Sequence, residues 1–290
     1  MGDNRLNSDS SIEQLGIMPL NSEEATSLII ERAKQLVNQL IECRGHNKLP
    51  FLPEEFSHIL DIRKIVKADL GGTSAILLRF HDGYVIKVNG NHHVVRQNFS
   101  CAHEIGHILF SELKLEHYIH SIEYRKFNPS KTVEIRARAR ERLCDAAATE
   151  LLMPEFIFRK YLSNFGLSVS SIEHLANIFK VSAKSAAIRV AEVSLESCIA
   201  LFWEPRLRNE PKVLKLAMCK GPGIKFFYYV PVHTNIRYPS ILHKAYEDDS
   251  PVKCYKKFER GNDVKRLPME SKGFGRKETR YVISLAFPDR

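Results

Sequence analysis

The feature that most constrains the fold of this chain is a His-Glu-x-x-His pattern, His103 to His107, inside a stretch of about residues 95–113 that we predict to be helical. Residues four positions apart on an α-helix differ by ~400° in rotation and ~6 Å in rise, so both imidazoles leave the same face. Two neutral ring nitrogens can then bind one zinc ion at about 2.0–2.1 Å, with Glu104 beside the metal. Because so short a pattern also arises by chance, it needs a third ligand.

A third ligand is available on a second predicted helix, about residues 133–152, which ends before Pro154. A catalytic zinc ion takes three protein ligands and leaves a fourth position for water. Glu141 can complete the site, and Asp145, one turn later, can accept a hydrogen bond from the second nitrogen of a ligand histidine. This is the arrangement of a gluzincin.

Two interpretations without catalysis compete with a hydrolytic site. One is a chance His-Glu-x-x-His pattern on a surface helix, and the other is a zinc ion with a purely structural role. Apolar residues on both sides of the pattern predict a half-buried helix; they are Phe99, Ala102, Leu109 and Phe110. An unpaired glutamate beside two histidines would be costly in that environment, which favours the hydrolytic interpretation.

The two motifs lie in longer blocks that resemble one known family. Residues 96–101, Arg-Gln-Asn-Phe-Ser-Cys, lead into the first motif, and residues 141–154 read Glu-Arg-Leu-Cys-Asp-Ala-Ala-Ala-Thr-Glu-Leu-Leu-Met-Pro. Together they are similar to the ImmA/IrrE family of metallo-endopeptidases. The resemblance implies a zincin-like fold with one zinc ion, ligands His103, His107 and Glu141, and Glu104 as the catalytic glutamate. It also implies that the substrate is a transcriptional repressor, usually one with an XRE-type helix-turn-helix.

The expected fold class is α+β, and the expected order of domains resembles the radiation-response branch of that family. We expect a tail at 1–20, a zincin-like helical peptidase domain with a small β-sheet at 21–160, a helix-turn-helix segment at 161–196, and a β-rich, GAF-like domain at 197–290. Before the first motif, we predict a helix from Asn21 or Ser22 to Gly45, a short helix at 54–60, and strands at 74–80 and 84–88 joined by the hairpin dipeptide Asp82-Gly83. Strand 84–88 is expected at the cleft edge, where it can pair with extended substrate.

The charge of the chain is concentrated in its last third. Residues 1–200 hold 24 Lys and Arg against 24 Asp and Glu, whereas residues 201–290 hold 19 against 10, which accounts for the net charge of +9. This excess indicates either a solvated face or a surface for nucleic acid or an acidic partner. The segment at 171–193 has the form of a helix-turn-helix but carries few basic residues, so both a structural packing unit and a DNA- or repressor-docking unit stay open.

Composition and the remaining side chains give further information on the class of protein and on its expected location. Hydrophobic residues at 44% and charged residues at 27% are ordinary for a folded protein, no apolar run reaches the ~18 residues of a membrane span, and no signal region is evident, so we expect a cytoplasmic protein without a membrane partner. Cys101 and Cys144 are either redox thiols beside the metal or, more in keeping with their type, packing residues. Candidates for oxyanion stabilisation or the cleft mouth are His92, His93, Tyr118, His120 and Tyr124, although solvated loop positions explain them as well.

The sequence thus predicts a zinc-dependent endopeptidase that cleaves a specific protein, most plausibly an XRE-type repressor, and so derepresses stress-response or mobile-element genes. The zinc ion would activate water and Glu104 would move its proton. The competing hypothesis is a non-enzymatic regulator that binds DNA through the helix-turn-helix and the basic domain and holds zinc only for structure.

Overall fold

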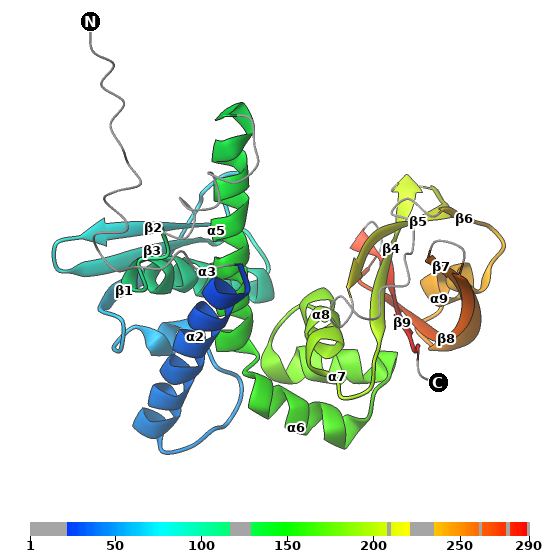
Figure 1. Ribbon diagram of the computed structural model, residues 1–290, viewed down its shortest axis with the longest axis horizontal. Helices are drawn as coiled ribbons and strands as arrows, with labels where there is room; N and C mark the ends of the chain where they lie inside the picture. The colour runs from blue at the N-terminus through cyan, green and yellow to red at the C-terminus, as the bar shows by residue number, and fades with distance from the viewer. Residues whose placement is uncertain are drawn as a thin grey trace, which may run out of the picture. The chain divides into compact units, whose positions relative to one another are not determined.

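The computed structural model describes residues 22–116, 129–207, 210–220, 235–260, 263–276 and 279–288. The chain divides into two compact units, which are described separately (Figure 1). The first contains residues 1–46, 53–91 and 100–151, and the second contains residues 47–52, 92–99 and 152–290. Helices dominate the first unit and a large sheet the end of the second, which confirms the α+β fold class. The finer boundaries at residues 160 and 196 stay a prediction.

The first unit opens with the long helix α2 (Ser22–Arg44). Glu23 and Glu24 in its first turn interact favourably with the positive end of the helix dipole. Gly45 follows the helix with a φ of 69°, the left-handed conformation that glycine often adopts at helix ends. One face of α2 is fully buried and supplies part of the core: Ala25, Ile29, Ala33, Leu36 and Val37. The helix predicted to end at Gly45 is confirmed.

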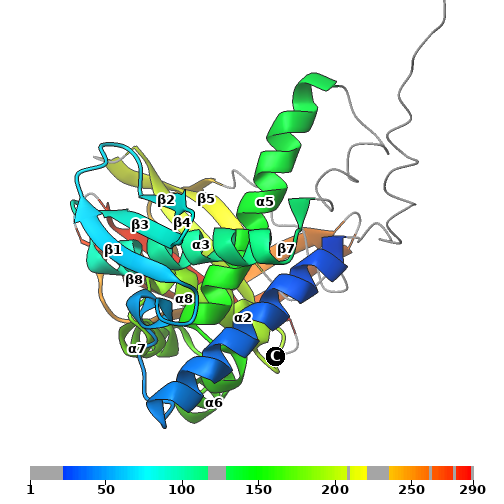
Figure 2. The same cartoon turned by 90° about the vertical axis from the view of Figure 1, so that its left-hand side faces the viewer.

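A three-stranded sheet lies beside the helices of this unit (Figure 2). It contains β1 (Ile62–Ala68), β2 (Ala75–Phe80) and β3 (Gly83–Asn89) in the order β1-β3-β2. Strand β3 is parallel to β1 and antiparallel to β2, so both of its edges are paired. The prediction that strand 84–88 lies at the cleft edge is therefore wrong, because the unpredicted strand β1 covers that side.

The hairpin between β2 and β3 also differs from its prediction. Phe80 pairs with Gly83, so the turn residues are His81 and Asp82, one position earlier than expected. Gly83 has a φ of 130°, and a Cβ atom there would lie 2.3 Å from the carbonyl oxygen of Asp61. Glycine is thus favoured at this position both by its positive φ and by the close approach of another segment.

Only one short turn of helix forms upstream, where residues 54–60 were expected to be helical. The 3₁₀ helix η1 (Pro53–Phe56) ends at Phe56, and the chain then turns to reach β1. Asp61 marks the change of direction with a φ of 53°. The predicted helix 54–60 is too long because this turn intervenes.

Helices α3 (Val94–Glu112) and α5 (Pro129–Leu152) carry the two sequence motifs and confirm both predicted helices. Helix α5 starts four residues earlier than expected, at Pro129. The two helices lie close together at Gly106, where a Cβ atom would be 2.8 Å from both the Cα and the carbonyl oxygen of Cys144. Residues 117–128, with Tyr118, His120 and Tyr124, lie outside the described residues, as does the tail at 1–20.

The second unit begins with three helices: α6 (Glu155–Phe165), which was not predicted, α7 (Val169–Phe179) and α8 (Ala183–Val193). The hydroxyls of Ser168 and Ser182 cap α7 and α8 by accepting hydrogen bonds from backbone N–H groups three residues later. The α7–turn–α8 arrangement confirms the predicted helical pair. However, Glu192 is the only exposed residue of α8, and Arg189 is buried with its Nε donating to the carbonyl of Met153.

The last third of the chain is β-rich, as predicted. It contains β4 (Ile199–Leu207), β5 (Glu210–Lys220), β6 (Asn235–Arg237), α9 (Ile241–Glu247), β7 (Val252–Arg260), β8 (Asp263–Phe274) and β9 (Tyr281–Ala286). The strands form one antiparallel sheet in the order β6-β5-β4-β9-β8-β7. The sequence also predicts a strand at 225–230, which lies outside the described residues.

Both faces of this sheet are covered within the second unit. Trp203 on β4 is fully buried in a cluster that includes Leu242 of α9. Its neighbour Glu204 points to the other face, as alternate strand residues do, and accepts a hydrogen bond from Lys184 of α8 at 3.0 Å. Lys272 of β8 likewise pairs with Glu173 of α7. The two helices of the helix-turn-helix are therefore packing elements for the sheet.

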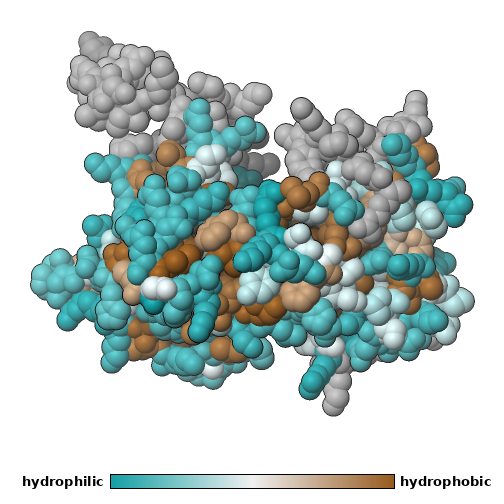
Figure 3. Space-filling model, turned by 90° about the horizontal axis from the view of Figure 1, so that it is seen from below, coloured by the Kyte–Doolittle hydropathy of each residue, from teal (hydrophilic) through white to brown (hydrophobic). Residues whose placement is uncertain are grey.

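Apolar side chains also reach the surface of the molecule. On the face drawn in Figure 3, hydrophobic patches alternate with larger hydrophilic areas. The large side chains that are most exposed include Leu195 (92%) and Tyr255 (67%). None of the helices among the described residues is long and apolar enough to cross a membrane.

Candidate metal centre

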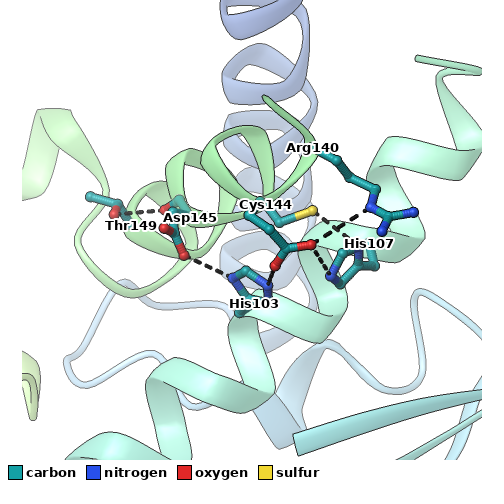
Figure 4. Close-up of polar contacts among 7 residues, drawn as sticks. His103, His107, Arg140, Cys144, Asp145 and Thr149 are labelled. Carbon is teal, nitrogen blue, oxygen red and sulfur yellow. Dashed lines mark hydrogen bonds and ion pairs between the residues drawn. The ribbon is translucent and has the colours of Figure 1, made fainter. Parts of the chain in front are cut away.

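Two helices of the first unit bring three metal-binding side chains together (Figure 4). His103 and His107 project from one face of α3, with ring centroids 4.9 Å apart, and the carboxylate of Glu141 on α5 lies close to both rings. The Nε2 atom of His103 lies 3.0 Å from one carboxylate oxygen of Glu141, and the Nε2 atom of His107 lies 3.8 Å from the other. All three side chains are half-buried, and their ligand atoms lie within 4.8 Å of one another.

This geometry fits a tetrahedral zinc site. With zinc–nitrogen and zinc–oxygen bonds of about 2.0–2.1 Å, two tetrahedral ligand atoms are about 3.3 Å apart. The two separations between histidine nitrogens and Glu141 oxygens, 3.0 and 3.8 Å, lie on either side of that value. Two imidazoles and one carboxylate also form the donor set of many catalytic zinc sites. The residues present therefore fit the metal that the sequence implies.

Each histidine has a partner for its second ring nitrogen, and both partners are on α5. Asp145 Oδ1 lies 2.8 Å from Nδ1 of His103, as expected from the sequence. The Thr149 hydroxyl, one turn later on α5, donates a hydrogen bond to the backbone carbonyl of Asp145. Cys144 Sγ lies 3.3 Å from Nδ1 of His107. Both contacts leave the Nε2 atoms directed at Glu141, which is the orientation that metal binding requires.

The charges at the site shift the pKa values of the two histidines in opposite directions. Burial lowers the pKa of His103, but the hydrogen bond and the charge of Asp145, with Glu141 and Glu104, outweigh burial and raise this pKa above its usual value. Burial and the charge of His103 lower the pKa of His107. His107 therefore loses its proton at a lower pH than His103, which keeps its proton more readily.

Glu104 lies beside the ligand group and is not part of it. Its side chain is half-buried, and its carboxylate accepts a hydrogen bond from the backbone N–H of Leu77 on strand β2. Burial raises the pKa of Glu104, the charge of His103 opposes that rise, and the charge of Glu141 adds to it. A carboxylate with a raised pKa is suited to accept and return a proton.

Two pairs of side chains had two possible roles each in the sequence analysis, and the structure shows the surroundings of both pairs. Cys101 and Cys144 are buried, and burial raises the pKa of both thiols, so both are held in the protonated form and fit packing better than redox chemistry. His92 and His93 serve the start of α3, where the carbonyl of His92 accepts from Gln97 and Nδ1 of His93 accepts from Val95.

Sequence reasoning missed two contributors to the site. One is the contact of Cys144 with His107, and the other is Gly106, whose lack of a side chain lets the backbone of Cys144 approach α3. The spacing does contain a signal for the first, because Glu141, Cys144 and Asp145 stand at positions i, i+3 and i+4 and share one helix face.

Two histidines one turn apart, a glutamate from a second helix and a separate glutamate beside them are the arrangement typical of zincin-like metallopeptidases. Comparison with known proteins agrees: residues 62–191 match the IrrE N-terminal-like domain family, Peptidase_M78. This match covers a little less than half of the chain, and over these residues the chain is similar to IrrE-type proteins.

Two curated relatives are radiation response metalloproteases IrrE. The protein from Deinococcus radiodurans is 35% identical over 109 residues, which are 37% of this chain and 31% of that protein. The protein from Deinococcus deserti is 33% identical over 110 residues, 38% of this chain and 36% of that protein. The matched region spans about a third of the length of these relatives. Among solved structures, a Mycobacterium tuberculosis transcriptional regulator aligns with a TM-score of 0.59 and 13% identity over 93% of this chain and 81% of that one, which is a likeness of fold.

Proposed function

We propose that this chain is a zinc-dependent endopeptidase that hydrolyses a bond in a specific protein. The observation that carries the proposal is the convergence of His103, His107 and Glu141, with Glu104 beside them and outside the ligand group. A site that served only structure would have four protein ligands, whereas three protein ligands leave a position for water.

The chain's own residues divide the work of peptide hydrolysis. A bound zinc ion would supply Lewis acidity, which lowers the pKa of water and polarises a carbonyl group. Glu104 takes a proton from the attacking water and later gives it to the nitrogen of the leaving amine. Asp145 accepts a hydrogen bond from Nδ1 of His103 and so keeps its Nε2 free for the metal.

The strand that fits an extended substrate is β2 rather than β3. Strand β2 is at the end of the sheet order, and among the described residues it pairs only with β3. Leu77 on β2 donates its backbone N–H to Glu104, so this strand passes directly beside the proposed general base. A substrate added along β2 would place its backbone next to Glu104.

The substrate that we propose is an XRE-type helix-turn-helix repressor, whose cleavage would derepress stress-response or mobile-element genes. The family resemblance supports the repressor, and the two relatives are named for radiation response. The test is incubation of the zinc-loaded full chain with candidate repressors, followed by mass spectrometry of the products. We expect one major cleavage, lost in Glu104→Gln. Zinc-dependent cleavage that survives Glu104→Gln would contradict the mechanism.

The competing function, a DNA-binding regulator with a structural zinc ion, is opposed by the burial of α8. A recognition helix must present several side chains to the major groove. On α8 only Glu192 is exposed, and the basic side chains of Lys184 and Arg189 are engaged with Glu204 and the carbonyl of Met153. We infer that the helical pair serves to hold the sheet.

We also propose that the GAF-like domain at 197–290 recruits an acidic partner or nucleic acid in the cytoplasm. Exposed basic residues on β7 and β8 support this proposal; they are Lys253, Lys257, Lys265 and Arg266. Lys257 lies directly opposite Arg266, a pairing that costs stability unless an anion neutralises it. Fluorescence anisotropy with duplex DNA at low and high salt tests it. Binding that weakens steeply with salt, and less steeply after Lys257→Glu, is expected, whereas salt-independent binding contradicts it.

A further inference from the structure

Cys144 contacts the metal-ligand candidate His107, and the proposed function gives this contact no role. Cys144 is fully buried on α5, and its Sγ atom lies 3.3 Å from Nδ1 of His107 on α3. Figure 4 shows the sulfur directed at the imidazole of His107, whose other ring nitrogen, Nε2, is the one that faces Glu141. The thiol and the carboxylate of Asp145 therefore occupy equivalent places, each behind one ligand histidine.

We propose that Cys144 is a positioning residue whose sulfur accepts a hydrogen bond from Nδ1–H of His107 and so presents Nε2 of His107 to the metal. This inference rests on the proposed zinc site. A neutral imidazole that binds a metal through Nε2 must carry its proton on Nδ1, which then needs an acceptor. In the half-buried setting of His107 the thiol sulfur is the acceptor that lies within reach. Metal-binding histidines generally have such an outer partner.

The backbone explains why a residue as small as cysteine can reach the ring. Gly106 precedes His107, and a Cβ atom on it would lie only 2.8 Å from the Cα of Cys144. The absence of that Cβ lets α5 approach α3, so a side chain with one atom beyond Cβ spans the remaining distance. The consecutive residues Cys144 and Asp145 then serve histidines that stand one turn apart on α3.

The experiment measures zinc affinity of the full chain by competition with a chromophoric chelator, for the wild type and for Cys144→Ala, Cys144→Ser and Cys101→Ala. Cys101 is the matched control, because it is a buried cysteine on α3 near His103. We expect Cys144→Ala to weaken zinc binding roughly 10- to 100-fold. Cys144→Ser should retain most of the affinity because a hydroxyl oxygen also accepts a hydrogen bond, and Cys101→Ala should bind zinc within about 2-fold of wild type.

A packing role predicts a different pattern. In that case Cys144→Ala would bind zinc like Cys101→Ala, or Cys144→Ser would be as weak as Cys144→Ala, and either result overturns the proposal. If the alanine variant does not fold, NMR of the zinc-loaded wild type with ¹⁵N-labelled histidine decides. A protonated Nδ1 on His107 is expected, and a deprotonated one refutes the assignment. If the wild-type chain binds no zinc, that result would instead contradict the proposed zinc-dependent function itself.

Discussion

Replacing Gly106 with alanine tests whether the close approach of α3 and α5 sets the geometry of the metal centre. The added Cβ would lie 2.8 Å from both the Cα and the carbonyl oxygen of Cys144, whereas ordinary contacts begin at 3.4 Å. The helices must therefore separate by about 0.6 Å, the difference between these two values, to restore an ordinary contact. The opposing atoms belong to backbone, so a change of rotamer cannot relieve the clash.

The expected effect on metal binding is larger than the effect on stability. A metal site tolerates ligand distances only within about ±0.2 Å, so moving Glu141 relative to His103 and His107 should weaken zinc binding by about 10-fold or more. For the fold, alanine in place of glycine in a helix contributes about 1 kcal/mol, and overpacking costs about 1–3 kcal/mol. The free energy of unfolding should therefore fall by no more than about 2 kcal/mol.

The assay pairs chelator competition for zinc with thermal unfolding followed by circular dichroism. Gly72→Ala is the matched control, because it has no atom within 4 Å of the new Cβ and no positive φ. It should leave zinc affinity unchanged. Zinc affinity within 2-fold of wild type in a folded Gly106→Ala variant would refute the reasoning, since it would mean that the helices need not approach so closely.

The remaining predictions concern single side chains. Glu104→Gln should bind zinc with unchanged stoichiometry by metal analysis but cleave roughly 10²–10⁴-fold more slowly, and a loss of metal instead would make Glu104 a ligand. Asp145→Ala should weaken zinc binding about 10- to 100-fold at neutral pH. Because Asp145 raises the pKa of metal-free His103, its removal should also lower the pH below which the apparent zinc affinity begins to fall, as measured by zinc affinity from neutral to acidic pH. Arg189→Ala should lower the free energy of unfolding by about 1–3 kcal/mol in urea denaturation, because the buried carbonyl of Met153 loses its donor, and unchanged stability would contradict the packing role of α8.

The sequence was sufficient to predict the two helices that carry the candidate ligands and the grouping of those side chains. The spacing from His103 to His107 and from Glu141 to Asp145 fixes which side chains share a helix face, and that is a local property of the chain. The contact between Asp145 and His103 was expected on this basis and is present at 2.8 Å.

Arrangements that depend on distant segments could not be predicted in the same way. Strand β1, Ile-Arg-Lys-Ile-Val-Lys-Ala, has three basic residues among seven and a mixed burial pattern, so its periodicity is weak, yet it covers the edge of β3. The close approach of Asp61 to Gly83 joins segments that are far apart in sequence, and the contact of Cys144 with His107 depends on the separation of two helices. Each of these arrangements is determined by tertiary packing, which cannot be predicted from a local sequence pattern.

The most direct test of the central claim is anomalous diffraction at the zinc edge from crystals of the zinc-loaded full chain. We expect one zinc ion in the first unit, bound by Nε2 of His103, Nε2 of His107 and a carboxylate oxygen of Glu141, with a water molecule in the fourth position and Glu104 within hydrogen-bond distance of that water. A zinc ion with four protein ligands, whether the fourth is Glu104 or Cys144, would be a closed structural site and would contradict the account.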